Sequence, residues 1–311
     1  SVSRGLGDVY KRQGNLISKG YHKKYGENHA ERDALLKLKN NEAEGGTLYV
    51  NLEPCSHFGK TPPCVDLIIK HKLKRVVIGM KDVNPKVDGI TKLKNAGIEV
   101  DFVLEEEARF LNRMFIKTMT EKMPYVVLKT ASTMDGKIAS KTGSSKWITS
   151  ETARKEVYRM RKEFDCIMTS SNTVIADNPS MQHNFKCILD KDLRTPKDAK
   201  IYQQGEIYIA SKENTPLKDK QLDIEAVLKN LYSKGIYSVF VECGGTLAGS
   251  MLKDNLIDEV YQFIAPKILN DNNGLSCFNG ADIKEISQAK NLKIYELKQI
   301  EKDILIKAIV L

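Results

Sequence analysis

The sequence predicts an α/β protein of two domains, and three observations support this prediction. Apolar runs of strand length alternate with segments of helical periodicity, which is typical of a sheet covered by helices. A length of 311 residues fits about two domains of ordinary size. A helical pattern over residues 105–120 ends at a Lys-Met-Pro sequence (122–124), and a strand-rich segment follows. We therefore expect domains over residues 14–122 and 123–311.

Residues 1–13 fit neither domain. They have neither helical nor strand periodicity and resemble a translated sequencing adapter, so we expect them to be non-native. The first domain then begins with a short strand over 15–20. Its further expected elements, in order, are a helix over 29–39 capped by Asn28, a strand over 47–52, a helix over 64–71, a strand over 74–80 and the helix over 105–120.

The second domain opens with a strand over 125–131. Thr149 or Ser150 is expected to cap a helix over 151–163, whose basic C-terminal end suits the helix dipole. The remaining expected elements are strands over 165–169, 186–190, 206–210 and 238–242, a helix over 222–234, and a terminal hairpin of 292–297 with 304–311. These elements predict a mixed sheet with flanking helices.

A catalytic zinc site is predicted from His29, Cys55 and Cys64. One imidazole and two thiolates are good zinc ligands, and three protein ligands leave the fourth tetrahedral position for water. Glu31 follows His29 by two residues, and zinc nucleobase deaminases carry H-x-E and P-C motifs in which the Glu moves the proton. Taken singly, these residues are more often a surface histidine and core thiols. Their combination favours zinc and hydrolytic loss of ammonia.

Composition narrows the class of protein. Hydrophobic residues make up 41% of the chain, and the sequence contains neither an apolar run of membrane-spanning length nor an apolar signal segment. We therefore expect a cytoplasmic enzyme. The net charge of +9 is spread along the chain, so it favours an anionic small molecule over nucleic acid. Six scattered cysteines do not form a disulfide framework, and the four outside the zinc motif are expected in the core: Cys166, Cys187, Cys243 and Cys277.

Residues 242–250 run from a strand through two glycines into the start of a helix. Backbone N–H groups there can hold a dinucleotide diphosphate, because glycines permit close approach and a helix N-terminus favours anions. A plain tight turn is the alternative. The G-x-G-x-x-G fingerprint is missing from this segment, so it does not predict a Rossmann domain.

Residues 52–64 (Leu-Glu-Pro-Cys-Ser-His-Phe-Gly-Lys-Thr-Pro-Pro-Cys) closely resemble the deaminase half of the bifunctional riboflavin-biosynthesis deaminase/reductase family, which has the same long cysteine spacing. Residues 128–139 and 144–149 resemble its reductase half, and the resemblance covers 14–311. It implies a cytidine-deaminase-like three-layer α/β/α domain followed by a dihydrofolate-reductase-like α/β domain. The family opens with a helix and a strand that residues 1–13 do not supply, so the first domain is expected to lack both.

The resemblance also implies roles for residues in both halves. It keeps His57 outside the metal's ligands, and it implies that Lys60, Asp82 and Asn84 contact the pyrimidine and its phosphoribosyl arm. In the reductase half, the residues implied to face the substrate are Ser145, Arg161, Met181 and Glu242. Those implied to face NADPH are Ala131, Trp147, Thr173, Asp177, Gly244, Gly245, Thr246, Leu247, Ala248, Gly249 and Ser250.

One departure concerns residues 181–184, Met-Gln-His-Asn, where the family usually carries Leu-Thr-x-Arg, so a substrate arginine is missing. The implied activity is deamination of a diaminopyrimidine ribosylamine phosphate at zinc, followed by NADPH-dependent reduction of its ribosyl chain to ribityl. A homo-oligomer is expected. Two alternatives stay open: a nucleic-acid or nucleoside deaminase, and a non-enzymatic zinc module with His57 as a fourth ligand.

Overall fold

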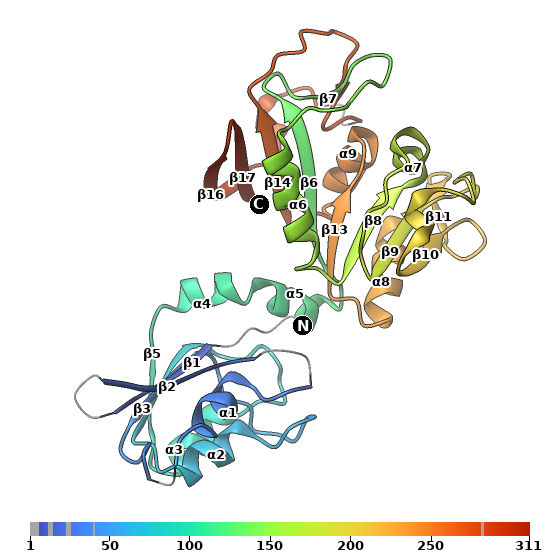
Figure 1. Ribbon diagram of the computed structural model, residues 1–311. Helices are drawn as coiled ribbons and strands as arrows, with labels where there is room; N and C mark the ends of the chain where they lie inside the picture. Colours follow the sequence, from blue (N-terminus) through green and yellow to red (C-terminus); the bar gives the residue numbers. More distant parts are fainter. Residues whose placement is uncertain (1–5, 12–14, 23–25, 40, 281–282) are drawn as a thin grey trace. The chain divides into compact units, whose positions relative to one another are not determined.

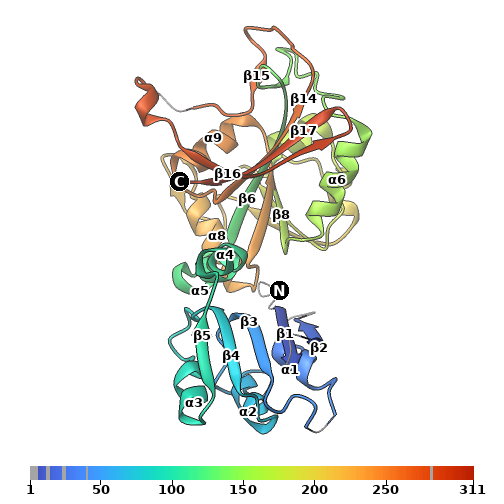
Figure 2. The ribbon, with the colours of Figure 1, turned by 90° about the vertical axis from the view of Figure 1, so that its left-hand side faces the viewer.

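The computed structural model describes residues 6–11, 15–22, 26–39, 41–280 and 283–311 (Figures 1 and 2). The chain divides into two compact units, Ser1–Lys122 and Met123–Leu311. Each unit is built on its own sheet with helices against it, so the predicted α/β class is confirmed. No helix in the described ranges is long and apolar enough to span a membrane.

The first unit contains a five-stranded sheet in the order β2-β1-β3-β4-β5. Strands β3, β4 and β5 run parallel, and β1 is antiparallel to both β2 and β3. The carboxyl ends of β3 and β4 therefore meet at one edge, from which the loops after these strands emerge. The strands are β1 (Leu6–Lys11), β2 (Asn15–Tyr21), β3 (Thr47–Leu52), β4 (Arg75–Met80) and β5 (Glu99–Phe102).

Helices cover both faces of this sheet, which confirms the three-layer architecture. Val76 and Ile78 of β4 share a core with residues of α1, α2 and α3 on one face. Gly79 points to the other face, where a Cβ would lie 2.6 Å from Ala108 of α4. The helices are α1 (Ala30–Leu35), α2 (Cys64–Lys70), α3 (Gly89–Asn95), α4 (Glu105–Leu111) and α5 (Arg113–Glu121).

The prediction that residues 1–13 supply no strand is wrong. The backbone of Leu6–Lys11 forms β1 inside the sheet, with Val9 opposite both Ser18 and Leu48. Residues 1–5 and 12–13 lie outside the described residues. Pairing inside a sheet uses the backbone N–H and C=O groups that every residue except proline carries, so a segment without periodicity can still pair. The first unit therefore has this strand, and in the described part of the chain no helix precedes it.

Two helix boundaries also differ from the prediction. The expected helix over 29–39 ends at Leu35, and its N-cap is His29 rather than Asn28, without a capping side-chain hydrogen bond. The expected helix over 105–120 is two helices that meet at Asn112. The Asn112 side chain donates to the Ala108 carbonyl at 2.9 Å, and such local bonds compete with helix continuation.

The second unit contains an eight-stranded mixed sheet in the order β10-β9-β8-β13-β6-β14-β17-β16. The six strands from β10 to β14 in this order are all parallel to their neighbours. The predicted terminal hairpin, β16 with β17, adds two antiparallel strands at one edge. The strands are β6 (Tyr125–Thr133), β8 (Cys166–Ser170), β9 (Phe185–Leu189), β10 (Glu206–Ala210), β13 (Ser238–Glu242), β14 (Glu259–Ala265), β16 (Leu292–Ile300) and β17 (Asp303–Val310).

Two helices cover one face of this sheet and α6 lies on the other. Val126 and Val239 share a core with residues of α8 and α9. On the α6 side, the ring of Phe240 lies 4.9 Å from that of Phe164. The remaining elements are β7 (Lys137–Ala139) with β15 (Leu275–Ser276), β11 (Leu217–Lys218) with β12 (Gln221–Leu222), helices α6 (Glu151–Arg161), α7 (Ser171–Asp177), α8 (Ile224–Ser233) and α9 (Gly245–Lys253), and the 3-10 turns Lys200–Gln203 and Ile286–Gln288.

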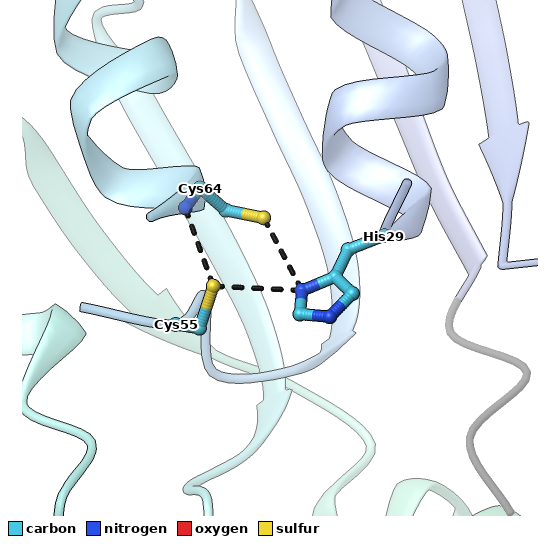
Figure 3. Close-up of side chains that lie close together, drawn as sticks. All are labelled: His29, Cys55 and Cys64. Atoms are coloured by element: carbon cyan, nitrogen blue, oxygen red, sulfur yellow. Dashed lines mark hydrogen bonds between the residues drawn. The ribbon is translucent and has the colours of Figure 1, made fainter. Parts of the chain in front are cut away.

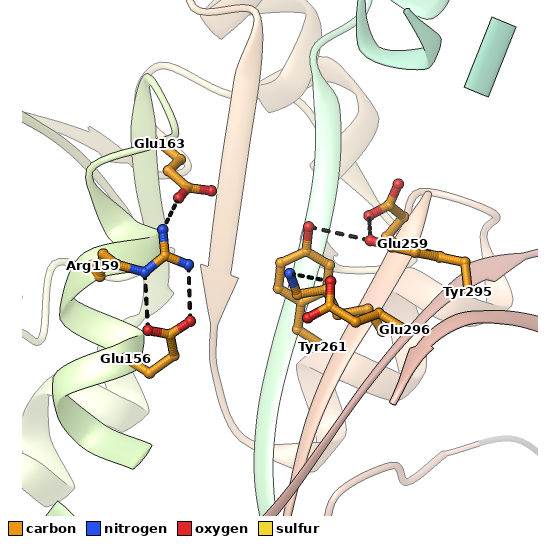
Figure 4. A network of polar contacts seen from close by, with 8 residues as sticks. Glu156, Arg159, Glu163, Glu259, Tyr261, Tyr295 and Glu296 are labelled. Atoms are coloured by element: carbon orange, nitrogen blue, oxygen red, sulfur yellow. Dashed lines mark hydrogen bonds and ion pairs between the residues drawn. The ribbon is translucent and has the colours of Figure 1, made fainter. Parts of the chain in front are cut away.

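Strand β14 lies inside the sheet, between β6 and β17, and was not predicted. It begins with Glu259, a charged residue that is fully buried. The Glu259 carboxylate accepts hydrogen bonds from the hydroxyls of Tyr125 at 2.6 Å and Tyr295 at 2.7 Å. Figure 4 shows the bond from Tyr295. These two tyrosines come from other strands of the sheet. A buried carboxylate needs hydrogen-bond donors, and the fold supplies them to Glu259 from residues that are distant in the sequence.

Candidate zinc and cofactor sites

Three side chains from separate elements of the first unit converge (Figure 3). His29 immediately precedes α1, Cys55 follows β3 at the sheet edge, and Cys64 is the first residue of α2. The Cys55 and Cys64 sulfurs lie 3.4 Å and 3.5 Å from the His29 Nδ1 atom. All three ligand atoms lie within 4.8 Å of one another.

The spacing of these atoms fits zinc. Typical Zn–S and Zn–N bonds at a tetrahedral angle separate a sulfur from a nitrogen by about 3.6 Å. The two sulfur-to-Nδ1 distances, 3.4 Å and 3.5 Å, are close to that separation. Hydrogen bonding with Cys64 lowers the pKa of Cys55 below its usual value, which favours the thiolate form that binds a metal. The donor set and its geometry therefore suit Zn²⁺.

The histidine inside the cysteine loop is not part of this cluster. Among the described residues, only His29, Cys55 and Cys64 form a group that can hold a metal ion. His57 lies elsewhere, and its Nδ1 atom is buried with no hydrogen-bond partner in the described part of the chain. A structural zinc module needs a fourth protein ligand, which this geometry does not supply. A three-ligand site keeps one position for chemistry.

Glu31 lies in the first turn of α1 and is only 8% exposed. Its carboxyl group lies beside the Cys64 thiol, and burial raises the pKa of Glu31 above its usual value. A carboxyl group with a raised pKa holds and releases a proton more readily near neutral pH. The structure thus places the predicted proton carrier against the ligand cluster.

Two residues missed by sequence reasoning fix the loop that carries Asp82 and Asn84. The buried Glu53 carboxylate accepts the backbone N–H of Asp82 at 3.1 Å and that of Ile90 at 3.0 Å. Ser56 adds a hydroxyl oxygen that accepts the backbone N–H of Asp88 at 2.7 Å. The available signal was a charged residue directly before the Pro-Cys ligand sequence. The turn bearing Cys55 and the segment 82–90 therefore form one hydrogen-bonded structure.

The predicted pyrimidine contacts have different environments. Asp82 is partly buried, and burial raises its pKa to about 6, so its carboxyl group titrates close to neutral pH. Its oxygen accepts the backbone N–H of Asn84 at 2.7 Å, which orders the turn between them. Lys60 is an exposed residue of the cysteine loop. Asp82 and Asn84 are thus held in place by the chain itself.

In the second unit, the predicted cofactor residues follow the carboxyl ends of neighbouring parallel strands. Ala131 lies near the end of β6, Thr173 and Asp177 lie in α7 directly after β8, and the segment 244–250 begins α9 directly after β13. Open α/β sheets bind ligands at this edge. The sheet topology therefore gathers residues that are more than a hundred positions apart in the sequence.

A buried ion pair stands at the end of β13. Arg161 of α6 donates to both oxygens of Glu242, at 2.5 Å and 3.1 Å, and the two side chains are 12% and 10% exposed. Lys129, opposite Glu242 on β6, lies 3.5 Å away and was missed by sequence reasoning. Burial opposes ionisation of Glu242, but the charges of Arg161 and Lys129 outweigh it and lower its pKa. Two of the predicted substrate residues thus bind each other.

A cavity of about 380 Å³ lies beside the loop that carries Ser145 and Trp147. Trp147 is 61% exposed, and the Arg154 guanidinium lies 4.1 Å from its ring centre. The Ser145 hydroxyl lies 3.5 Å from the Asp177 carboxylate, which ties this loop to α7. Lys267 also lines the cavity, and its Nζ donates to the Trp147 carbonyl at 2.6 Å.

The two glycines predicted to cradle a diphosphate differ. A Cβ on Gly245 would lie 2.0 Å from the Ser276 carbonyl oxygen, so this glycine is needed for packing. A Cβ on Gly249, one turn later, would lie 1.8 Å from the Asn279 carbonyl oxygen. Gly244 has no described heavy atom within 4 Å of its Cβ position. Of these three glycines, only Gly244 therefore has open space at its Cβ position among the described residues.

The segment that replaces the expected arginine is occupied by structural contacts. Met181 is 4% exposed and offers little surface to a substrate. The His183 ring contacts backbone carbonyls on both sides, Phe185 O at 2.8 Å from Nδ1 and Phe164 O at 3.0 Å from Nε2. Neither side chain takes the place of a free cation.

Comparisons with known proteins agree with these two sites. The cytidine and deoxycytidylate deaminase zinc-binding region matches residues 7–80, and the RibD C-terminal domain matches residues 124–306. The riboflavin biosynthesis protein RibD of Aquifex aeolicus is 40% identical, over 97% of this chain and 90% of its own length. RibD of Escherichia coli is 35% identical, over 96% of this chain and 91% of its own length.

Solved structures give the same result. RibD of Acinetobacter baumannii superimposes with a TM-score of 0.86 at 35% identity, over 99% of this chain and 92% of its own. A Thermotoga maritima diaminohydroxyphosphoribosylaminopyrimidine deaminase / phosphoribosylaminouracil reductase has the same TM-score, identity and coverage. The match of residues 124–306 to the RibD C-terminal domain favours this family over a nucleic-acid deaminase. The chain therefore belongs to the RibD family of riboflavin biosynthesis proteins, as a bifunctional enzyme that joins a zinc-dependent deaminase to an NADPH-dependent reductase.

Proposed function

We propose that the first unit deaminates the diaminopyrimidine ribosylamine phosphate of riboflavin biosynthesis and that the second unit reduces the ribosyl chain of the product to ribityl. The observation that carries this proposal is the three-ligand cluster with a buried carboxyl group beside it, in a chain that also bears the reductase domain. Incubation with the diaminopyrimidine tests it. Ammonia release without NADPH, and NADPH oxidation only after that release, are the expected results.

The deaminase step assigns roles to the residues of the first unit. His29, Cys55 and Cys64 would hold Zn²⁺, which lowers the pKa of a coordinated water to about 7 when bound. Glu31 accepts the proton of the attacking water and delivers it to the departing amino group, so that water and amine become carbonyl and ammonia. Asp82 and Asn84 orient the pyrimidine from the ordered turn, and Lys60 meets the phosphate.

In the reductase step the residues of the second unit bind and orient. Trp147, Thr173, Asp177 and the backbone at Gly244 would hold NADPH, which supplies the hydride. Glu242, kept ionised by Arg161 and Lys129, offers an acceptor to the sugar hydroxyls. Arg161 uses two donors on Glu242 and keeps further N–H groups for the substrate. The family usually has an arginine in the segment after residue 180. This chain would bind the substrate without that arginine.

Glu53→Gln is expected to raise the KM for the diaminopyrimidine about tenfold while zinc content stays at one per chain. In the glutamine side chain an NH₂ group replaces one carboxylate oxygen. The backbone N–H of either Asp82 or Ile90 then loses its acceptor, because it faces a donor instead. Steady-state ammonia release and metal analysis measure both. Glu44→Gln is the control, because that carboxylate is 46% exposed and pairs only with Lys72 in the described contacts. An unchanged KM would leave Glu53 with a purely structural role.

Gly244→Val is expected to weaken NADPH binding about tenfold or more without unfolding the protein or slowing deamination. The chain leaves open space at the Cβ position of residue 244, so the valine side chain would not clash with the protein. A loss of affinity would therefore come from a clash between the valine and the cofactor. Gly249→Val is the contrasting variant, because its side chain meets the Asn279 carbonyl and lowers the Tm instead. Titration with NADPH and thermal melts separate the two. Normal affinity in Gly244→Val would place the diphosphate elsewhere.

A homo-oligomer and a cytoplasmic location complete the proposal. Strand β16 is a sheet edge, and it exposes Leu292, Ile294 and Leu297 at 45%, 56% and 66%. Exposed apolar edge strands favour association with another chain, and a second copy is the simplest partner. All six cysteines are free, which suits a reducing compartment where NADPH is available. Sedimentation equilibrium of the purified protein measures the oligomeric state.

A further inference from the structure

The loop of Trp147 is held mainly by polar contacts and not by core packing. Trp147 is 61% exposed, so apolar burial does little to fix its position. Lys267 donates to its carbonyl oxygen, Arg154 covers its ring, and the same Arg154 donates to the Thr149 carbonyl at 2.8 Å. All of these partners are themselves at least partly exposed. A further, buried anchor follows at Ser150.

Asp303 provides this buried anchor from the far end of the chain. It is the first residue of β17 and is 0% exposed. One oxygen, Oδ2, accepts both the backbone N–H of Ser150 at 2.7 Å and the Ser150 hydroxyl at 2.6 Å. Ser150 in turn caps α6 by accepting the N–H of Ala153 at 3.2 Å. The carboxylate thus fixes the point where the Trp147 loop becomes a helix.

Burying the Asp303 carboxylate costs free energy, and the pairing of β16 with β17 does not account for that cost. The second oxygen of Asp303, Oδ1, is buried and has no hydrogen-bond partner among the described residues. Burying a carboxylate with an unpaired oxygen is unfavourable, so its retention calls for a gain elsewhere. The nearby Glu301 binds the Thr152 hydroxyl at 2.6 Å, but that pair is exposed. In the described contacts, Asp303 is the buried residue that joins the β16–β17 turn to the loop.

We propose that Asp303 is a positioning residue of the reductase: its buried carboxylate fixes residues 147–150 and thereby the orientation of Trp147 toward NADPH. The inference rests on the proposed function, because it takes Trp147 as a cofactor contact. It also makes the terminal hairpin part of the cofactor site, although none of its residues lines the cavity beside Trp147.

The chain contains a single tryptophan, so its fluorescence reports this loop directly. In the full-length wild-type protein, added NADPH is expected to quench Trp147 emission. In Asp303→Asn the emission maximum shifts before NADPH is added, the Kd for NADPH from the quenching curve rises about tenfold, and kcat at saturating NADPH changes less than about threefold. Glu301→Gln, in the exposed contact of the same turn, keeps the wild-type spectrum and Kd.

Each contrary result has a distinct meaning. If the Trp147 fluorescence of the wild-type protein does not change when NADPH binds, the assignment of Trp147 as a cofactor contact is wrong, and this inference is wrong with it. A normal wild-type response together with an unchanged spectrum and Kd in a folded Asp303→Asn overturns the inference alone. If circular dichroism shows that Asp303→Asn does not fold, Ser150→Ala takes its place, because it removes one of the two bonds from the other side. The same rise in Kd is required there.

Discussion

Replacing Glu31 by Gln is expected to slow ammonia release by about two to four powers of ten, the usual worth of general acid–base catalysis. The amide keeps the size of the side chain but cannot carry the proton from water to the departing amine. Zinc content should stay at one per chain, because Glu31 lies outside the ligand set. Ammonia release and metal analysis on the same purified sample give both quantities.

Asp66→Asn is a matched control for this variant. Asp66 follows Cys64 by two residues, as Glu31 follows His29, and it lies in the first turn of α2 but is exposed. It should keep the wild-type deamination rate. The reductase should work normally in both variants when the deaminated intermediate is supplied. Ammonia release at the wild-type rate in Glu31→Gln would remove Glu31 from the mechanism.

Replacing Cys64 by Ala is expected to abolish both zinc binding and deamination. Two protein ligands remain, and structural and catalytic zinc sites in proteins use three or four. The loss in deaminase rate should exceed the roughly hundredfold effect that changes around a metal's ligands produce. Metal analysis after dialysis and an ammonia assay with added Zn²⁺ measure it.

Cys277→Ser serves as the control for Cys64→Ala, because Cys277 lies in the second unit and its backbone N–H, not its sulfur, bonds Gly136. It should retain zinc and the full deamination rate. Stoichiometric zinc in Cys64→Ala would point to another ligand. His57 is then the residue to replace next, since it lies in the same loop as the two cysteines.

The zinc cluster was predictable from sequence because its chemistry depends on residue type. His29, Cys55 and Cys64 are good zinc ligands in any fold, and the His-x-Glu and Pro-Cys contexts are specific. The position of Glu53 directly before the Pro-Cys sequence was a signal, but its role was not predictable, because that role comes from backbone N–H groups 29 and 37 positions away. Such contacts leave no local pattern. The same holds for Lys129, which reaches Glu242 only because β6 and β13 pair in parallel.

The sequence by itself determined the α/β class and the family and predicted the zinc ligands and the proton carrier, because periodicity and ligand chemistry are local properties of the chain. Tertiary structure decided what depends on backbone pairing and burial. It placed a strand at Leu6–Lys11, where side chains gave no signal. It assigned Gly245 to packing and left Gly244 open, a difference set by the neighbouring Ser276 carbonyl. It also brought Asp303 to Ser150 across 153 positions, because a carboxylate can be buried only where the fold supplies its donors.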